Sequence, residues 1–423
     1  MGGLAILAGG GPAPGINAVI SAATIRARIQ GIEVHGVLDG FSRLIDGAED
    51  ATMPLEIDDV ARMHYRGGSM LGIARANPTR SEADLDRVID GLERRGIDKL
   101  VTIGGDDTAY SAFRTSQRAE GRIRVAHVPK TIDNDLDLPP EIDTFGYQTA
   151  RSVGVDVVRN LMTDAKTTRR WYLVVAMGRT AVHLALGIGK AAGTTLTVIP
   201  EEFGDRRVRM DEIVDILAGA ILKRRAEGRE DGVAVIAEGV ALSIAEEDLG
   251  RLGPIERDAH GHVRMAEIDF AGGLKRLVRD RMRELGIEMT IVDKNIGYEV
   301  RCADPVPFDM EYCRDLGYCA AKFLIEGGSG ALVSMQGGRF VPCPLEEMLD
   351  PETNRMQVRR VDIHSTRYAI ARRYMIRLRR DDLEDEGELR RLAEVAGLSP
   401  DEFRERFQPV VADEPPSLHL ATS

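Results

Sequence analysis

The chain of 423 residues is too long for one small module and suits two α/β domains. Apolar residues make up 43% of it and charged residues 29%, a balance typical of a folded globular protein rather than a disordered one. The formal charge of -12 argues against a nucleic-acid-binding protein, because such proteins need a basic face to displace counterions from phosphates.

Short β-rich runs alternate with helical patterns along the first part of the chain. Strands are predicted at residues 4–8, 34–38, 99–104 and 123–129, and helices at 15–29, 109–116 and 146–166. Ser81 is expected to cap a further helix, with Asp84 three residues on and Gly96 as its stop signal. This alternation predicts βαβ units and a parallel sheet.

A second series of strands and helices follows. Strands are predicted at 172–177, 195–200, 232–239 and 288–293, with helices at 182–192 and 211–227. Two sheets are therefore expected, in two Rossmann-like α/β domains of three layers each with mainly parallel strands. From about Arg359 the sequence is charge-dense with helical spacing, which predicts a helical C-terminal extension, and the final dozen residues are expected to be mobile.

Nothing in the sequence predicts a membrane or secreted protein. No apolar run approaches the roughly 20 residues that span a bilayer, and the N-terminal MGGLAILAGG has no basic region. The four cysteines form no C-x-x-C pair, so reduced thiols are expected. We expect a cytoplasmic protein that binds neither nucleic acid nor membrane.

Four glycine-marked turns each stand at the carboxyl end of a predicted strand, where open parallel sheets bind ligands. They are GGGPAPGIN (Gly9–Asn17), GGSMLGIAR (Gly67–Arg75), GGDDT (Gly104–Thr108) and PKTIDNDL (Pro129–Leu136). Backbone N–H groups and a helix N-terminus suit an anion, although the first motif taken alone is better explained by a plain tight turn. Three acids, Asp106, Asp133 and Asp135, cannot lie near a polyphosphate without a cation, which implies Mg²⁺.

These motifs, taken together, resemble those of the 6-phosphofructokinases. After the four turns, the family's order continues with MGR (Met177–Arg179), PEEF (Pro200–Phe203), AEG (Ala237–Gly239) and GYEVRCADPVPFD (Gly297–Asp309). The resemblance runs from Gly3 to about Gly338. It implies a phosphofructokinase fold with a donor domain at 1–142 and about 296–345, a sugar-phosphate domain at 143–295, and a helical extension at 346–423 with a mobile tail.

The resemblance also assigns roles to individual residues. It implies that Asp133 is the general base for the 1-hydroxyl of fructose 6-phosphate, assisted by Asp135, Lys130 and Thr131, and that Asp106 meets Mg²⁺. On the donor side it places Gly11, Arg75, Asp107 and Thr108. The residues expected to hold the sugar phosphate are Arg170, Met177, Gly178, Arg179, Glu238, Lys294, Tyr298 and Arg301. Arg170 matches an arginine that this family lends to a neighbouring subunit, so a homodimer or homotetramer with shared sites is expected.

Two positions favour the pyrophosphate-dependent branch of the family. Its ATP-using members have glycine at the positions of Asp107 and Lys130. Asp107 would repel a nucleotide's α-phosphate, since two unit charges about 4 Å apart interact by roughly 4 kcal/mol at an effective dielectric near 20. Lys130 can supply charge to the end of pyrophosphate, and reversible transfer from pyrophosphate is expected. The alternative is that Asp107 points away as the N-cap of the following helix.

Some positions depart from the family pattern. Tyr298 replaces a histidine of the sugar-phosphate site, and Val292 stands where an arginine is often found, with Lys294 as the candidate replacement for its charge. Pro12 and Val182 also differ from the usual residues. Sedoheptulose 7-phosphate is therefore a second acceptor to consider.

Three other functions stay open at this point. An ATP-dependent phosphofructokinase would tolerate Asp107, and nucleotide dependence of the activity separates it from the first reading. A non-catalytic subunit that only binds sugar phosphate would not need the acids, Arg75 and Lys130 together. A Rossmann dehydrogenase is disfavoured because the first turn lacks G-x-G-x-x-G.

Overall fold

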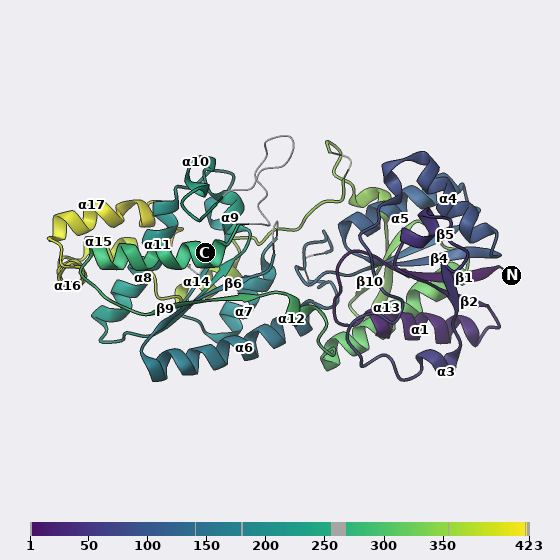
Figure 1. Ribbon diagram of the computed structural model, residues 1–423, viewed down its shortest axis with the longest axis horizontal. Coiled ribbons are helices and arrows are strands. Elements are labelled where there is room, and N and C mark those ends of the chain that lie inside the picture. The colour runs from purple at the N-terminus through teal and green to yellow at the C-terminus, as the bar shows by residue number, and fades with distance from the viewer. Residues whose placement is uncertain are drawn as a thin grey trace. The chain divides into compact units, whose positions relative to one another are not determined.

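The structure is a computed structural model that describes residues 2–139, 141–178, 181–254, 268–353, 355–418 and 420. Contacts divide the chain into two units, one made of Met1–Val153 and Tyr298–Arg359 and the other of Gly154–Gly297 and Arg360–Ser423. Each unit is therefore built from two stretches of chain. Figure 1 shows the elements of both.

The first unit is built on a seven-stranded sheet of order β11-β10-β5-β4-β1-β2-β3. Its strands are β1 (Gly3–Ala8), β2 (Val34–Val37), β3 (Thr52–Pro54), β4 (Ile97–Gly104), β5 (Arg124–Pro129), β10 (Ala331–Gln336) and β11 (Arg339–Pro344). The central strands are parallel, and β3 and β11 add to the two edges in antiparallel fashion. All six residues of β1 are buried, as expected for a strand with helices on both faces.

Helices cover both faces of this sheet (Figure 1). One face carries α1 (Ile16–Arg28), α3 (Ile57–Val60) and α13 (Pro307–Ile325), whose apolar residues join those of β1 in one core cluster. The other face carries α2 (Ser42–Ile45), α4 (Glu82–Glu93) and α5 (Asp106–Ala119), which form a second cluster. The shorter elements of this unit are η1 (Pro78–Arg80), α12 (Tyr298–Arg301) and η4 (Leu345–Met348).

The second unit has a four-stranded parallel sheet of order β7-β8-β6-β9. Its strands are β6 (Trp171–Ala176), β7 (Leu196–Val198), β8 (Gly232–Ala237) and β9 (Ile291–Ile296). The helices before the C-terminal segment are α6 (Tyr147–Thr168), which begins in the first unit, α7 (His183–Ala192), η2 (Pro200–Phe203), α8 (Met210–Ala226), α9 (Val240–Ser243), α10 (Glu246–Leu249) and α11 (Phe270–Glu284). The α8 and α11 helices pack on each other and on the sheet.

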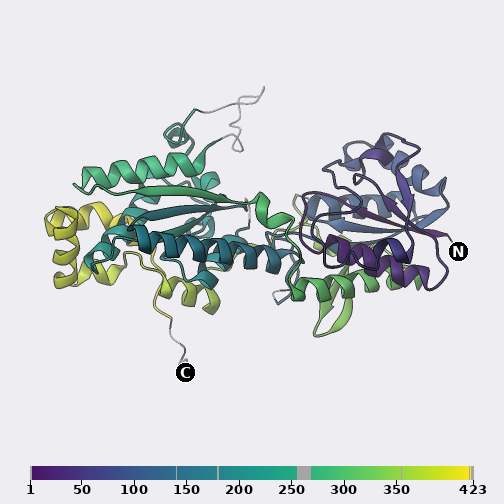
Figure 2. The ribbon, with the colours of Figure 1, turned by 60° about the horizontal axis from the view of Figure 1, so that its bottom comes forward.

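The C-terminal segment forms part of the second unit. It contains α14 (Thr366–Tyr374), α15 (Arg380–Glu384), α16 (Glu386–Ala396) and α17 (Pro400–Val411), and both α16 and α17 pack on α8. Figure 2 shows these helices, in yellow, against the rest of the unit. Leu389, Leu392, Phe403 and Phe407 are fully buried there, so this segment belongs to a hydrophobic core.

The predicted α/β class, with largely parallel sheets and a helical C-terminal region, is confirmed. The expected cap also forms, since the Ser81 side chain accepts a hydrogen bond from the Asp84 N–H at 3.1 Å and α4 begins at Glu82. Among the described residues, no helix is both long enough and apolar enough to cross a bilayer.

Candidate active site

Backbone hydrogen bonds fix the first two glycine loops to one another. The Gly10 N–H donates to the Ala74 carbonyl at 3.0 Å, and Gly9 forms a β-bridge with Ala74. Gly10 has φ 85°, a conformation that glycine adopts without steric cost. Gly11 and Arg75 each follow a residue of this Gly10–Ala74 hydrogen bond, so both lie at the same edge of the sheet.

Asn17 holds the second loop in place from the start of α1. This side chain is 2% exposed, and its amide donates to the carbonyls of Arg66 and Gly67 at 3.1 and 3.2 Å. Its oxygen accepts from the Met70 N–H at 2.9 Å. Sequence reasoning included Asn17 in the first motif but gave it no role.

The GGDDT loop leads from β4 into α5. The helix begins at Asp106, and its N-cap is Gly105, which makes no side-chain cap. The alternative that Asp107 is the N-cap is therefore wrong, since Asp107 lies within the first turn. Asp106 and Asp107 are exposed, whereas Thr108 is 5% exposed and packs against Gly9 and Gly104 so closely that a Cβ on either glycine would collide with it.

The electrostatic surroundings of Asp107 contain charges of both signs. Loss of solvent raises the pKa of its carboxyl group, and the neighbouring Asp106 raises that pKa further. The positive charges of Arg355 and Arg75 act in the opposite direction. Arg355 was not among the predicted site residues, and no motif pointed to it.

Lys130 lies at the centre of the donor-side residues. It is 4% exposed, and its ammonium group donates a hydrogen bond to the Gly11 carbonyl. Burial lowers the pKa of Lys130 to about 8, and the nearby positive charge of Arg301 also lowers it. The carboxylates of Asp133 and Asp135 partly compensate. A cation with a lowered pKa beside a glycine loop is poised to receive an anion.

A buried histidine, His127, contacts the end of β4, where the GGDDT loop begins. His127 is fully buried on β5, and burial lowers its pKa to about 3, so the imidazole is neutral. One ring nitrogen lies 3.0 Å from the Gly104 carbonyl and the other lies 2.9 Å from the Thr102 hydroxyl. A neutral imidazole can satisfy both contacts only by donating to Gly104 and accepting from Thr102. His127 thereby helps to fix the start of the GGDDT loop.

The loop that carries the candidate base is held by its own side chains. The Thr131 hydroxyl accepts from the Asp133 N–H at 3.0 Å, and the Thr144 hydroxyl donates to the Thr131 carbonyl at 2.7 Å. Asn134 takes the left-handed conformation with φ 56°. Burial raises the pKa of Asp135, and the charge of Asp106 adds to that rise, so these two carboxylates lie near enough to interact.

Arg359 clamps the far side of this loop. Its guanidinium donates to the carbonyl oxygens of Asn134, Leu138, Pro139 and Ile142 at distances of 2.9 to 3.4 Å. Its own N–H donates to the Asp135 carbonyl at 2.8 Å, and the preceding residue, Val358, forms a β-bridge with Leu136. We call residues 356–359 the loop strap. Sequence reasoning missed it, because a charge-dense segment gives no sign of where its arginines bind.

The fit of a divalent cation can be tested on the acids of this unit. Among the residues that the structure describes, no three His, Cys, Asp or Glu side chains are grouped as a complete metal site. Magnesium in phosphoryl-transfer sites is usually held by one or two carboxylates together with the substrate's phosphates. Exposed Asp106, with Asp135 within electrostatic range, fits that arrangement.

Two of the expected sugar-phosphate residues belong to the first unit. Tyr298, which is 80% exposed, and Arg301 lie on α12, where the guanidinium stands 5.4 Å from the centre of the tyrosine ring. Arg301 also lies directly against Gly11, where a Cβ would overlap the guanidinium. The structure therefore groups Arg301 with the donor-side residues of this unit.

Three others come together at the carboxyl end of the second sheet. Met177 and Gly178 follow β6, and Glu238 follows the neighbouring β8. The Glu238 N–H donates to the Ala176 carbonyl at 2.8 Å, and its carboxylate accepts from the Gly178 N–H at 3.4 Å. Gly178 has φ 136°, which restricts this position to glycine.

The remaining predicted residues lie elsewhere in the second unit or outside the described residues. Lys294 is within β9, in register with Val174 of β6. Arg170 precedes β6, and its guanidinium lies 3.8 Å from the Asp164 carboxylate. Arg179 falls outside the described residues.

These loops lie at the carboxyl ends of parallel strands and carry acids, a buried lysine and arginines next to backbone N–H groups. Such loops are typical of a phosphotransferase site on an α/β scaffold. The chain belongs to the phosphofructokinase family, whose pattern matches residues 3–324.

Relatives with this architecture are known from sequence and structure. The chain is 51% identical over 409 residues to pyrophosphate–fructose 6-phosphate 1-phosphotransferase from Thermotoga maritima, covering 96% of this chain and 97% of the relative. It is 46% identical to the protein of the same name from Naegleria fowleri, over 96% and 95% of the two chains. The fold also matches a solved structure from Marinobacter aquaeolei, titled a pyrophosphate-dependent phosphofructokinase, with TM-score 0.66, 17% identity and coverage of 94% and 92%.

Proposed function

We propose that the protein transfers a phosphoryl group reversibly from pyrophosphate to the 1-hydroxyl of fructose 6-phosphate, giving fructose 1,6-bisphosphate and phosphate. Mg²⁺ is the proposed cofactor, and the cytoplasm is the proposed location. The observation that supports pyrophosphate as the donor is that the buried Lys130 donates a hydrogen bond to the Gly11 carbonyl. Lys130 follows β5, and Asp107, the second acid of the GGDDT loop, follows the neighbouring strand β4. The two relatives named above, at 51% and 46% identity, support the same donor and acceptor.

The proposed chemistry gives each predicted residue one role. Asp133 takes the proton of the sugar 1-hydroxyl, and the hydroxyl oxygen attacks the terminal phosphorus of pyrophosphate. The P–O bond to the bridging oxygen of pyrophosphate breaks, and phosphate leaves. Arg75, Lys130 and the N–H groups around Gly11 neutralise and align the donor. Bound Mg²⁺, held by Asp106, would offset charge on the phosphates. The family resemblance assigns the sugar phosphate to Met177, Gly178, Arg179, Glu238, Lys294, Tyr298 and Arg301.

The test compares donors and removes the base. Purified protein is assayed with fructose 6-phosphate and Mg²⁺, using pyrophosphate or ATP, and Asp133→Ala is assayed beside Asp137→Ala. Asp137 is the matched control because it is exposed in the same loop. We expect pyrophosphate to be the donor, and Asp133→Ala to lose about 10² to 10⁴ in kcat while Asp137→Ala keeps wild-type activity.

The other outcomes separate the rival functions. Preference for ATP would point to the ATP-dependent enzyme, a function borne by the name of a 32% identical relative from Mycobacterium tuberculosis. Absence of turnover with either donor, together with retained binding of fructose 6-phosphate, would point to a regulatory subunit. A higher rate with sedoheptulose 7-phosphate would change the acceptor and leave the transfer chemistry in place.

A further inference from the structure

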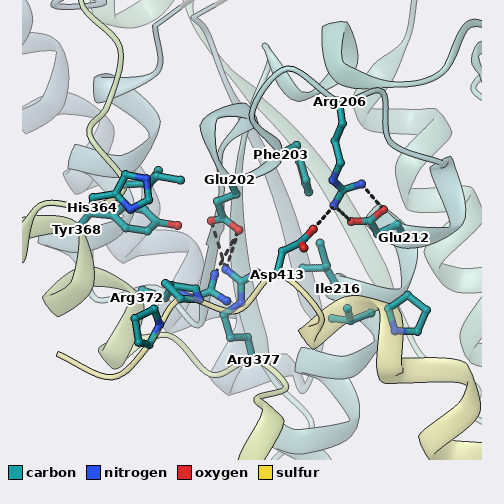
Figure 3. Close-up of a pocket in the computed structure, with 15 residues that line it drawn as sticks. Glu202, Phe203, Arg206, Glu212, Ile216, His364, Tyr368, Arg372, Arg377 and Asp413 are labelled. Carbon is teal, nitrogen blue, oxygen red and sulfur yellow. Dashed lines mark hydrogen bonds and ion pairs between the residues drawn. The ribbon is translucent and has the colours of Figure 1, made fainter.

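A pocket of about 180 Å³ lies in the second unit, among residues that the proposed reaction does not use. Its walls come from η2, α8, α14, α17 and the segment that follows α17. Phe203, Ile216 and Val410 form an apolar part of the lining, and Arg372, Arg377 and Tyr368 form a polar part. Figure 3 shows Phe203, Ile216, Tyr368, Arg372 and Arg377 around the pocket.

The polar part contains two arginines for one acid. Glu202, whose side chain is 7% exposed, lies 3.4 Å from Arg372 and 2.9 Å from Arg377, whose side chains are 8% and 3% exposed. A buried ion pair requires compensation of each charge, and here one carboxylate faces two guanidinium groups. This corner of the pocket therefore carries an excess positive charge.

The other acids of the pocket are engaged elsewhere. Glu212 lies 2.5 Å and Asp413 lies 3.1 Å from Arg206, and Figure 3 shows these three side chains to the right of Glu202. The side chains of Arg206 and Asp413 are 41% and 70% exposed, so water solvates that ion pair, while the 17% exposed Glu212 is paired with the same arginine. Glu212 and Asp413 therefore neutralise the charge of Arg206 and not the charges of Arg372 and Arg377.

Two buried hydrogen-bond donors next to the excess charge have no partner among the residues that the structure describes. They are the Nε atoms of Arg372 and Arg377. The hydroxyl of Tyr368, a residue that is 2% exposed, points towards Glu202, and burial, followed by the Glu202 charge, raises the pKa of Tyr368. Buried donors without acceptors are rare and costly in folded proteins.

We propose that this pocket is a binding site for a small organic or inorganic oxyanion. Carboxylate or phosphate oxygens would accept hydrogen bonds from the Nε atoms of Arg372 and Arg377, whose Nη1 atoms stay on Glu202, and from the Tyr368 hydroxyl. An apolar body would lie against Phe203 and Ile216. The volume is about that of six water molecules, similar to cavities that hold a benzene-sized ligand. The ligand would tie α14 to η2 within the second unit.

Calorimetric titration of the purified full chain tests this site. The probes are inorganic phosphate and malonate, each compared with chloride at equal ionic strength. The variants are Arg372→Gln and Arg373→Gln, because Arg373 is exposed on the same helix and does not line the pocket. For at least one probe we expect one binding event per chain that weakens at least about tenfold in Arg372→Gln and persists in Arg373→Gln.

Phosphate bound at the proposed active site will persist in both variants, so the two events are distinguishable. Tyr368→Phe is the second test, since it removes only a hydroxyl; we expect the same event to weaken several-fold while the melting temperature without ligand stays near wild type. The proposal is overturned if neither probe binds, or if Arg372→Gln and Tyr368→Phe, both folded by circular dichroism, bind both probes as tightly as Arg373→Gln.

Discussion

In the proposed function, Asp107 and Lys130 select the donor through two different effects. Asp107 places a negative charge in the first turn of α5, while Lys130 places a buried positive charge against the Gly11 loop. The longer donor, ATP, would have to extend past the negative charge of Asp107. The shorter donor, pyrophosphate, needs only the positive charge of Lys130. Selection between pyrophosphate and ATP therefore follows from two separate interactions.

These interactions predict how donor preference changes on substitution. In Asp107→Gly, kcat/KM for ATP should rise by about 10² to 10³, since a repulsion of roughly 4 kcal/mol is removed. In Lys130→Gly, kcat/KM for pyrophosphate should fall at least about tenfold, because a charged hydrogen bond is lost. Asp137→Gly is the control for a lost loop acid. Equal ATP use by Asp107→Gly and wild type would show that Asp107 does not select the donor.

The lowered pKa of Lys130 predicts that the pH profile of kcat/KM for pyrophosphate has an alkaline limb, that is, a fall at high pH. The ammonium group is charged below pH 8 and loses its charge above it, so kcat/KM for pyrophosphate should fall as pH rises through about 8. Pyrophosphate itself also ionises at alkaline pH, so Lys130→Arg is the control, because arginine stays charged. The limb should move upwards in this variant; the same midpoint in both proteins would assign it to another group.

Single residues of the site were predictable where a short motif fixes their chemistry. Gly11, Asp107, Lys130 and Asp133 were predicted in this way and stay predictions, and the structure adds that Lys130 contacts the Gly11 loop. The supporting residues His127, Arg355 and Arg359 were not found. Their contacts depend on distant parts of the chain, and neither composition nor spacing reveals which carbonyl or carboxylate a buried side chain meets.

At the scale of elements, the loop strap positions the candidate base by holding the backbone that follows it. Arg359→Ala would leave several carbonyls of the loop without their donor. We expect kcat to fall by about 10- to 100-fold, since a loop displaced by a fraction of an ångström misaligns the base. KM for pyrophosphate should change little, because Lys130 and Arg75 remain.

Two comparisons separate positioning from general destabilisation. Arg360→Ala is the matched control, since Arg360 lies 3.5 Å from a 98% exposed Asp205 and holds no loop. Millimolar guanidinium should restore part of the kcat of Arg359→Ala by occupying the vacated position. A loss of kcat in both variants, or no rescue, would mean that the strap does not act on the base through these hydrogen bonds.

The regular elements of both sheets were largely predictable because their strands are buried, apolar and separated by helices. The strands β3, β10 and β11 were not predicted. The first is three residues long, and β11 contains Pro342 and Pro344 with much of its surface exposed, as edge strands permit. Helical spacing did predict helices after Arg359, but it could not indicate that they pack on α8.

At the scale of the whole molecule, Arg170 bears on the proposed oligomer. Within the part of the chain that the structure describes, its Nε is buried without a hydrogen bond, and it lies 3.8 Å from the Asp164 carboxylate. If Arg170 serves a neighbour's site, mixing inactive Asp133→Asn with inactive Arg170→Ala should restore activity. Random exchange in a symmetric dimer would give about a quarter of the wild-type value, because half of the dimers would each contain one intact site.

The mixture of Asp133→Asn with Arg169→Ala is the matched control for the arginine position, since Arg169 is exposed beside Arg170, and it should give about half of the wild-type activity with or without exchange. Arg169→Ala is expected to be active alone. Failure of the Asp133→Asn and Arg170→Ala mixture to regain activity, with exchange demonstrated by differently tagged subunits, would place all catalytic groups within one chain.

The division of the first unit into two stretches of chain also bears on its synthesis. The strand β5 pairs with β10, and α1 packs on α13, yet β10 and α13 both follow Tyr298. Residues 130–330 separate β5 from β10, and a ribosome making roughly 5–20 residues per second adds these roughly 200 residues in about 10 to 40 seconds. During that time the nascent β5 has an unpaired edge and α1 an uncovered apolar face, so this half of the protein is exposed to aggregation until the later segment emerges.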